Sequence, residues 1–261
     1  MKKIKIALTV ASSDSGCGAG VQADMLSIAQ NGVFATMAIA SLTAQNPNKV
    51  TDIAPLPASF LKSQLDTVNS YFEIDALKCG MLYDKANIEI LADFVEANPH
   101  IRFVADTVMI ATSLAKLLKD DAIESLERRL LPLAELITPN LDEAKALLNS
   151  DDFSNLEEMS KHLSQKYNTS VLLKGGHLEG DDIEDILYLK SGKIYKYKTT
   201  RIKNINTHGS GCTLSACICA NFAKGLSIAE SVERARAFLL KGMRKPVKIG
   251  DEYFINHLVK L

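Results

Sequence analysis

The amino-acid sequence predicts an α/β fold in which a mostly parallel central sheet is covered by helices on both faces. Short apolar runs of strand length alternate along the chain with amphipathic segments of helix length. Residues 184–200 break this order, because two strand-like runs flank Ser191-Gly192-Lys193 and are typical of an antiparallel hairpin. Polar or glycine-rich clusters follow most of the strand-like runs, where the chain is expected to turn into the next helix.

Each element is predicted by its pattern, beginning with a first strand over the apolar run 4–11. A glycine-rich loop leads from this strand to a helix over about residues 21–31, which stops at Gly32, and the second strand follows over about 35–43. The same order then recurs. The further expected elements are helix 57–71, strand 75–79, helix 84–97, strand 101–105, helix 120–130, strand 134–138, helices 140–149 and 154–167, strand 169–174, the hairpin within 184–200, and helices 208–223 and 227–243.

Length and charge limit the kind of protein this is. The 261 residues, 47% of them hydrophobic, suffice for one large domain or two small ones. No linker or repeat divides the chain, so we expect a single domain over 1–261. Lys and Arg number 30 and Asp and Glu 31, without a basic run, which argues against nucleic acid as a partner.

The expected compartment is a reducing one. No apolar run reaches the roughly 18 residues that span a bilayer, so no membrane partner is expected. The basic N-terminus lacks the apolar core of a signal peptide. Five irregularly spaced cysteines do not form a disulfide framework. We therefore expect a cytoplasmic protein.

The stretch from Asn204 to Thr213 is the strongest candidate for a functional site. Gly209 and Gly211 flank Ser210, and the apolar run that follows predicts a buried helix beginning near Cys212. A helix N-terminus offers unpaired N–H groups and a positive dipole end to phosphate. The same position is expected to lower the pKa of Cys212. A nucleophile, a base and a contact to the reacting atom remain open as roles for this cysteine, and so does a buried cysteine without any role.

The first glycine run, Gly16-Cys17-Gly18-Ala19-Gly20, invites comparison with dinucleotide-binding loops. Its spacing is GxGxG rather than GxGxxG, and the second strand ends in Thr43-Ala-Gln-Asn46 without a carboxylate. Hydride chemistry is therefore disfavoured. The sequence also contains no P-loop motif.

Further candidates follow other strands, where ligands of open α/β sheets bind. The Gln45 amide offers a donor and an acceptor to a heterocycle edge. Asn140 and Glu143 have the spacing of a capping box, which explains them without any ligand. They could also orient water around Mg²⁺ bound to phosphates, a cation that Asp106 could serve too. His208 could bond a substrate or the backbone.

Seven motifs, taken together and in this order, resemble the hydroxymethylpyrimidine/phosphomethylpyrimidine kinases of thiamin biosynthesis, a branch of the ribokinase-like superfamily. The resemblance runs from about residue 6 to about residue 243. The motifs are Ala11-Ser-Ser-Asp-Ser-Gly-Cys-Gly-Ala-Gly-Val-Gln-Ala-Asp24, Thr43-Ala-Gln-Asn46, Lys78-Cys-Gly-Met81, Asp106-Thr-Val-Met109, Thr138-Pro-Asn-Leu-Asp-Glu143, Lys174-Gly-Gly-His177 and Asn206-Thr-His-Gly-Ser-Gly-Cys-Thr213.

The resemblance implies a three-layer α/β/α sandwich, usually a homodimer, that uses ATP and Mg²⁺ to phosphorylate 4-amino-5-hydroxymethyl-2-methylpyrimidine and then its monophosphate. It implies roles for residues of four kinds. These are Cys212 with Gly209, Ser210 and Gly211 in catalysis; Ser12, Ala19, Gly20, Asp24, Gln45, Met81 and His208 for the pyrimidine; Asn140, Lys174, Gly176 and Thr207 for ATP and its phosphates; and Glu143 with Asp106 for Mg²⁺, partly through water.

Four departures from the family pattern are visible. Ser12 replaces a glycine, Cys17 interrupts the glycine run, and Leu114 replaces a glycine after Ser113. The usual C-terminal signature is reduced to the stretch Gly250–His257, which we expect to be peripheral, with His257 a surface or helix residue. Ser12 and Cys17 add bulk beside the expected substrate pocket.

Three other functions remain open from the sequence. A pyridoxal kinase of the same branch could bind its aldehyde substrate reversibly through Cys212. A hydrolase could use Cys212 for acyl transfer, but His208 is too close in sequence to serve as its partner easily. A nucleotide-binding regulator without turnover is disfavoured because Asn140, Glu143 and Cys212 are all present.

Overall fold

The computed structural model describes residues 3–109, 120–150, 153, 155–176 and 180–259. Its main feature is a nine-stranded sheet in the order β3-β2-β1-β4-β5-β6-β7-β8-β9. The six strands from β2 to β7 in this order pair in parallel, whereas β3 at one edge and β8 and β9 at the other pair antiparallel. The fold class predicted from the sequence is confirmed.

The elements alternate as the sequence indicated. The strands are β1 Ile6–Asp14, β2 Phe34–Asn46, β3 Lys49–Pro55, β4 Ala76–Cys79, β5 Arg102–Ala105, β6 Leu136–Ile137, β7 Ser170–Leu173, β8 Asp182–Tyr188, β9 Ile194–Thr200, β10 Val247–Ile249 and β11 Glu252–Phe254. The helices are α1 Gly20–Gln30, α2 Ala58–Tyr71, α3 Lys85–Ala97, α4 Asp120–Ser125, α5 Leu141–Leu148, α6 Leu156–Tyr167, α7 Ser210–Ala223 and α8 Ile228–Arg244.

The structure differs from the expected elements in four places. β1 continues through Ser12–Asp14, which were expected in a loop, because these residues still pair with β2 after a register shift. β3 was not expected. None of its residues is buried, so its sequence shows no alternation of apolar and polar residues. The expected helix 120–130 changes after Ser125 into a π-helical turn over Leu126–Leu130. The small β10–β11 hairpin was also missed.

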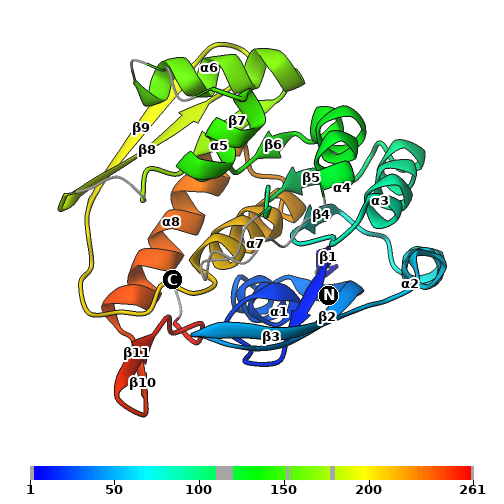
Figure 1. Ribbon diagram of the computed structural model, residues 1–261, viewed down its shortest axis with the longest axis horizontal. Helices are drawn as coiled ribbons and strands as arrows, with labels where there is room; N and C mark the ends of the chain where they lie inside the picture. Colours follow the sequence, from blue (N-terminus) through cyan, green and yellow to red (C-terminus); the bar gives the residue numbers. More distant parts are fainter. Residues whose placement is uncertain (1–2, 110–119, 151–152, 154, 177–179, 260–261) are drawn as a thin grey trace.

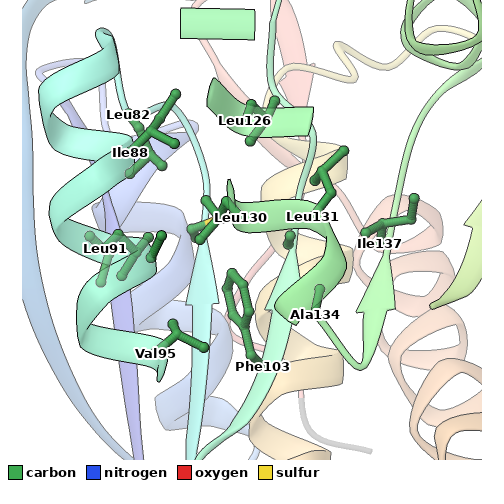
Figure 2. Packing of buried hydrophobic residues seen from close by; sticks show 14 of the residues in the cluster. Leu82, Ile88, Leu91, Val95, Phe103, Leu126, Leu130, Leu131, Ala134 and Ile137 are labelled. Carbon is green, nitrogen blue, oxygen red and sulfur yellow. The ribbon is translucent and has the colours of Figure 1, made fainter. Parts of the chain in front are cut away.

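Helices cover the two faces of the sheet in unequal groups. Figure 1 shows α2 to α6 along one face and α1, α7 and α8 along the other. The first face carries the larger apolar cluster, in which Leu91 of α3 and Leu130 of the π-helical turn meet Phe103 of β5 (Figure 2). The second cluster joins Val104 of β5 to α7 and to Phe238 of α8. Burial of both clusters is the main stabilising contribution to the fold.

Helix α7 is the most enclosed helix of the structure. Every residue from Thr213 to Ala223 is buried, because α7 lies between the sheet and the two helices α1 and α8. This position explains why the run is apolar all round rather than amphipathic. Over the described part of the chain, no helix combines the length and apolarity that crossing a membrane requires.

The strand order places a binding crevice at one point of the sheet. From β1 the chain first moves outward to β2 and β3, and then returns to the other side of β1 to form β4. The connections after β1 and β4 therefore diverge, which opens a crevice beyond the carboxyl ends of these strands. The N-terminus of α7 lies at the same edge, since Gly209 closely approaches Gly18 in the connection after β1.

Candidate functional site

A cleft of about 1070 Å³ lies at the carboxyl edge of the parallel strands. This volume is sufficient for a nucleotide and a small heterocycle together. Of the expected site residues, the structure brings all but Asp24 to its walls. These are Ser12, Ala19, Gly20, Gln45, Met81, Asp106, Asn140, Glu143, Lys174, Gly176, Thr207, His208, Gly209, Ser210, Gly211 and Cys212.

The N-terminus of α7 lines this cleft. Gly209 is its N-cap residue, and no side chain caps the helix. The Ser210 N–H donates to the Thr207 carbonyl at 3.0 Å and is thereby withdrawn from any ligand. The N–H groups of Gly211 and Cys212 have no acceptor among the described residues. These two amides, with the dipole of α7, form a candidate anion-binding position, which is called the anion-binding position below.

Two glycine loops approach each other closely beside this position. A Cβ at Gly209 would lie 1.8 Å from the Gly18 carbonyl oxygen, and the φ of Gly209 is 78°. A Cβ at Gly18 would in turn lie 2.6 Å from Cδ2 of His208. Gly18 therefore serves close packing against the anion-binding loop. Gly16 and Gly20 instead approach Gln45 and the Ser12 carbonyl, so the three glycines of the GxGxG run meet different neighbours within the fold.

The expectation of a lowered pKa for Cys212 is wrong. Burial raises the pKa of the Cys212 thiol to about 11, and the nearby Lys78 ammonium only partly opposes this effect. The carboxylates of Asp24 and Asp106 raise it further. Desolvation therefore outweighs the helix terminus, and Cys212 is a neutral thiol at pH 7. Its sulfur accepts a hydrogen bond from the Gly20 backbone, which directs it toward the crevice.

Asp24 does not line the cleft as expected. Its side chain is fully buried and bonds Nζ of Lys78 through both oxygens, at 2.8 and 2.9 Å, and the Thr9 hydroxyl at 2.6 Å. Burial alone would favour neutral Lys78, but the Asp24 carboxylate outweighs it and raises the pKa of that lysine. The pair joins α1 to β4 beneath the crevice. Removal of one partner would leave an uncompensated buried charge.

Two carboxylates and a lysine flank the anion-binding position. Asp106, directly after β5, accepts hydrogen bonds from Thr138 at 2.9 Å, Ser215 at 3.0 Å and Lys174 Nζ at 3.2 Å. Although burial opposes its ionisation, the nearby ammonium groups hold the pKa of Asp106 below its usual value. Lys174 also lies beside α7, since a Cβ at Gly211 would be 3.4 Å from its Nζ.

Asn140 and Glu143 form the capping box that their spacing predicted. The Asn140 side chain accepts the Glu143 N–H at 2.9 Å, and Glu143 Oε2 accepts the Asn140 N–H at 2.9 Å. Glu143 is nevertheless almost fully buried, and burial raises its pKa to about 7. The adjacent Asp106 carboxylate contributes to this rise. A glutamate that only caps a helix does not need to be buried beside a second carboxylate.

This donor set is chemically suited to Mg²⁺. The carboxylates of Asp106, directly after β5, and of Glu143, in the first turn of α5, face the cleft. A cation between them and a phosphate would offset the charge that raises the Glu143 pKa. No cluster of three or more metal-ligating side chains occurs in the described ranges. Two carboxylates are enough protein ligands for Mg²⁺, because this ion usually takes its other ligands from water and phosphate.

A polar chain that the sequence did not reveal connects Gln45 to the first loop. Nε2 of His208 lies 3.0 Å from Nε2 of Gln45 and 2.9 Å from Oδ2 of Asp14. Asp14 also accepts N–H groups of Gly16, at 2.8 Å, and of Ala19, at 2.8 Å. Burial opposes the charge of Asp14, but these bonds lower its pKa overall. Asp14 was missed because it lay within an apparent loop of small residues.

The opposite end of the cleft contains a second pair that was not expected. Arg236 of α8 forms an ion pair with Asp185 of β8, and the Gly175 N–H donates to Asp185 at 2.9 Å. Burial lowers the pKa of Arg236 to about 10. The hairpin β8–β9 supplies this wall together with Thr199. Nothing in the local sequence pairs residues 185 and 236, which are 51 positions apart.

The departures from the family pattern have different structural consequences. The Ser12 hydroxyl lies 2.5 Å from that of Ser41 and donates to the Met81 carbonyl at 3.0 Å, so it is held in the crevice wall. Cys17 is exposed and adopts a φ of 59°, a region that favours glycine. Leu114 lies outside the described residues.

Open helix N-termini beside a lysine and buried carboxylates are typical of enzymes that transfer phosphoryl groups. The helix-covered sheet is of the ribokinase-like type, and the fold and site together define the class of small-molecule kinases. The model of the phosphomethylpyrimidine kinase family matches residues 14–257. The chain belongs to this family and is an ATP-dependent kinase.

Individual relatives agree with this assignment. The hydroxymethylpyrimidine/phosphomethylpyrimidine kinase of Haemophilus influenzae is 40% identical over 257 residues, which is 96% of this chain and 95% of that protein. Among solved structures, Staphylococcus aureus pyridoxal kinase in complex with AMP-PCP and pyridoxal has a TM-score of 0.87 and 29% identity, covering 98% of this chain and 94% of that one. Phosphomethylpyrimidine kinase from Clostridium difficile has a TM-score of 0.80 and 32% identity, covering 92% and 99%.

Proposed function

We propose that this chain transfers the γ-phosphoryl group of Mg-ATP to 4-amino-5-hydroxymethyl-2-methylpyrimidine and then to its monophosphate, in thiamin biosynthesis. The observation that carries the proposal is the uncapped α7 N-terminus, with the free N–H groups of Gly211 and Cys212 beside Lys174. The full-length similarity to the Haemophilus influenzae kinase supports the substrate class. Both phosphorylations would use one cleft and a single domain over 1–261.

The chemistry follows from the charges around this position. Negative charge on the transferred phosphoryl group would be stabilised by the Gly211 and Cys212 amides and by Lys174, all fixed before the reaction begins. Gly209 holds the loop geometry, and Ser210 and Thr207 close the turn. Gly176, a residue of the cleft wall, would border the nucleotide phosphates. Mg²⁺, held by Glu143 and through water by Asp106, would neutralise phosphate charge.

The pyrimidine would bind at the crevice after β1. Gln45, positioned by His208 and Asp14, would pair its amide with the aminopyrimidine edge. Met81, Ala19, Gly20 and Ser12 border the same space; their identities are compatible with a flat ring of small size. Cys212 would contact the hydroxymethyl group as a neutral thiol. A base role at pH 7 is disfavoured by its raised pKa.

A pyridoxal kinase is the second candidate, and a specific observation favours it. The Staphylococcus aureus pyridoxal kinase, in complex with pyridoxal, shares this fold over 98% of the chain. An aldehyde could add reversibly to the Cys212 sulfur. The raised thiol pKa weakens this route, because the thiolate is the nucleophile.

An ATP-consumption assay with the hydroxymethylpyrimidine, its monophosphate and pyridoxal as acceptors tests the proposal. We expect turnover of both pyrimidines, with kcat/KM for pyridoxal lower by about a hundredfold, or about 2.7 kcal/mol. A preference for pyridoxal with an inert monophosphate would replace the first function by the second. Omission of Mg²⁺ should abolish turnover of every acceptor.

We also propose a homodimer in the cytoplasm. Phe34, Met37 and Leu42 on β2 are between 40% and 46% exposed, which supports contact with a second copy. All five cysteines are free, as in reducing compartments. Light scattering coupled to gel filtration should give a mass near twice 28.5 kDa, and a mass of 28.5 kDa would refute the dimer.

A further inference from the structure

The residues that follow α8 fold back onto the anion-binding loop. We call residues 247–259, which include β10 and β11, the return segment; Figure 1 shows its hairpin beyond the end of α8. Ile255 and Val259 are each 5% exposed and fasten it to the core. The Asn256 N–H donates to the Gly242 carbonyl at 3.2 Å, which joins the segment to α8. A mobile peripheral tail would not be packed in this way.

The first contact of the return segment with the site is through Asn206. Its N–H donates to the Tyr253 carbonyl at 2.8 Å, and its side-chain amide donates to Glu252 at 3.0 Å. Its side-chain oxygen accepts the N–H of His208 at 2.9 Å. Asn206 therefore connects β11 to the residue immediately before Gly209.

The second contact is through His257. Nε2 of His257 lies 2.8 Å from the Thr213 hydroxyl, which itself donates to the Gly209 carbonyl at 2.9 Å. A hydroxyl has one proton, so the bond to Gly209 requires His257 to donate through an Nε2–H. Burial lowers the pKa of His257, which favours the neutral ring at pH 7. The Gly209 carbonyl also accepts the Thr213 N–H at 2.8 Å.

We propose that the return segment sets the geometry of the anion-binding position, with Asn206 and His257 as positioning residues for phosphoryl transfer. The two contacts hold the loop on both sides of Gly209, one before it in the chain and one after it. The stretch Gly250–His257, expected to be peripheral, contacts Asn206 and Thr213, and under this proposal it influences the chemistry. The proposal rests on the proposed kinase function, because it concerns the position that would hold the transferred group.

The expected size of the effect follows from the mechanism. A preorganised donor loses much of its value when it shifts by a fraction of an ångström, since phosphoryl transfer depends mainly on alignment and fixed charges. Neither Asn206 nor His257 lines the cleft. Their loss should therefore lower kcat. The KM of the acceptor, which is determined near Gln45, should change little on loss of His257, whereas loss of Asn206 also frees His208 beside Gln45 and should raise it.

Steady-state kinetics of His257→Ala and Asn206→Ala test the proposal. We expect kcat to fall about tenfold in each variant, and in His257→Ala the acceptor KM should stay within about twofold of the unaltered chain. His257→Gln can still donate to Thr213 and should restore most of the rate. Leu258→Ala, 66% exposed in the same segment, is the matched control and should leave kcat unchanged.

Two further measurements separate positioning from general stabilisation. In a double-mutant cycle, Thr213→Val combined with His257→Ala should be no slower than the slower single variant, because both act through Gly209. Hydrogen exchange should be faster at the amides of residues 209–213 in His257→Ala, and unchanged in α1. A lowered Tm with unchanged kcat would show that the segment only stabilises the fold. Additive kinetic effects would overturn the route from His257 through Thr213 to Gly209.

Failure of the proposed function would give a different result. If the unaltered chain phosphorylates neither pyrimidine, the kinase assignment to thiamin biosynthesis is wrong, and the same variants are compared with the acceptor that it does use. The exchange measurement requires no acceptor. Unchanged exchange at residues 209–213 would overturn the positioning role whichever substrate the enzyme takes.

Discussion

The helices α5 and α7 both begin at the cleft, and they differ in what satisfies their first N–H groups. At α5 the Asn140 side chain accepts the Glu143 N–H, and Glu143 returns the bond to the Asn140 backbone. At α7 the N-cap is Gly209, which has no side chain, so two N–H groups face the cleft without a partner among the described residues. Both helices have the same dipole. Of these two helices, α7 is the one that retains free donors for an anion.

The difference shows how one backbone feature acquires two functions. The box at α5 stabilises the helix and at the same time fixes Glu143 at the cleft, where its carboxylate can serve a cation. The open end of α7 is less stable by itself, but it is held by tertiary contacts to Gly18 and Lys174. The capped N-terminus of α5 offers a ligand the Glu143 side chain, whereas the uncapped N-terminus of α7 offers it backbone N–H groups. The following changes test this contrast.

Gly209→Ala should have the largest effect. Its Cβ would clash with the Gly18 carbonyl and occupy a left-handed conformation, so the free donors of α7 would move. We expect kcat to fall about a thousandfold, together with a lower Tm, measured by steady-state kinetics and thermal melting. Gly225→Ala is the matched control: its φ is +81°, but no atom lies within 4 Å of the added Cβ. Gly225→Ala should lower the free energy of unfolding by about 1–2 kcal/mol and leave kcat unchanged.

Lys174→Met should lower kcat about a hundredfold at saturating ATP. The change removes the ammonium group beside Gly211 but leaves the α7 backbone intact. It therefore tests whether the free N–H groups of Gly211 and Cys212 support phosphoryl transfer without the lysine charge. Lys62→Met, an exposed lysine paired with Asp66, should have no kinetic effect. A Lys174 variant with normal kcat and only a raised KM for ATP would limit Lys174 to binding.

The Mg²⁺ requirement should depend on pH through Glu143 at α5. Because its pKa is about 7 in the metal-free chain, the carboxylate is charged above pH 7 and becomes protonated as pH falls through 7. Mg²⁺ competes with that proton, so the Mg²⁺ concentration for half-maximal rate should rise up to about tenfold per unit below pH 7. Glu143→Gln should abolish this dependence.

The nucleotide provides the necessary control for that titration. Phosphate groups also titrate near pH 6, but they do so equally with both enzymes. The difference between the unaltered chain and Glu143→Gln therefore isolates the carboxylate. Identical pH profiles for the two proteins would exclude Glu143 from the cation site and leave it a capping residue only.

Asn140→Ala should have the smallest effect, and mainly on stability. Loss of the N-cap acceptor should cost about 1 kcal/mol of unfolding free energy and loosen Glu143, measured by urea denaturation. Asn155→Ala is the matched variant, since Asn155 caps α6 through the Glu158 N–H. The two variants should lose similar amounts of unfolding free energy, but only Asn140→Ala should raise the Mg²⁺ concentration needed for half-maximal rate. Equal Mg²⁺ requirements in the two variants would show that the Asn140 cap does not contribute to the cation site.

Much of the fold could be predicted because periodicity is a local signal. The strand and helix pattern places most boundaries within a few residues, and the Asn140–Glu143 spacing identifies a true capping box. β3 escaped prediction because an edge strand needs no buried face. The π-helical turn at Leu126–Leu130 escaped because helical periodicity does not distinguish it from an α-helix.

The candidate site was predictable as a set of positions, but less so in its electrostatics. The rule that ligands bind beyond parallel strands located Gln45, Asp106 and Lys174 at one edge. It did not give the protonation state of Cys212, because a pKa depends on how much water the fold removes. The ion pair of Asp24 with Lys78 joins residues 54 apart in the chain.

The sequence by itself determined the α/β order, the glycine loops and the uncapped start of α7, since each depends on neighbouring residues alone. The tertiary structure decided that Cys212 remains a thiol, that Asp24 lies beneath the cleft, and that the return segment reaches Thr213 through His257. These features arise from burial and from contacts between distant segments. Local pattern carries no information about either, because both depend on which surfaces meet when the chain folds.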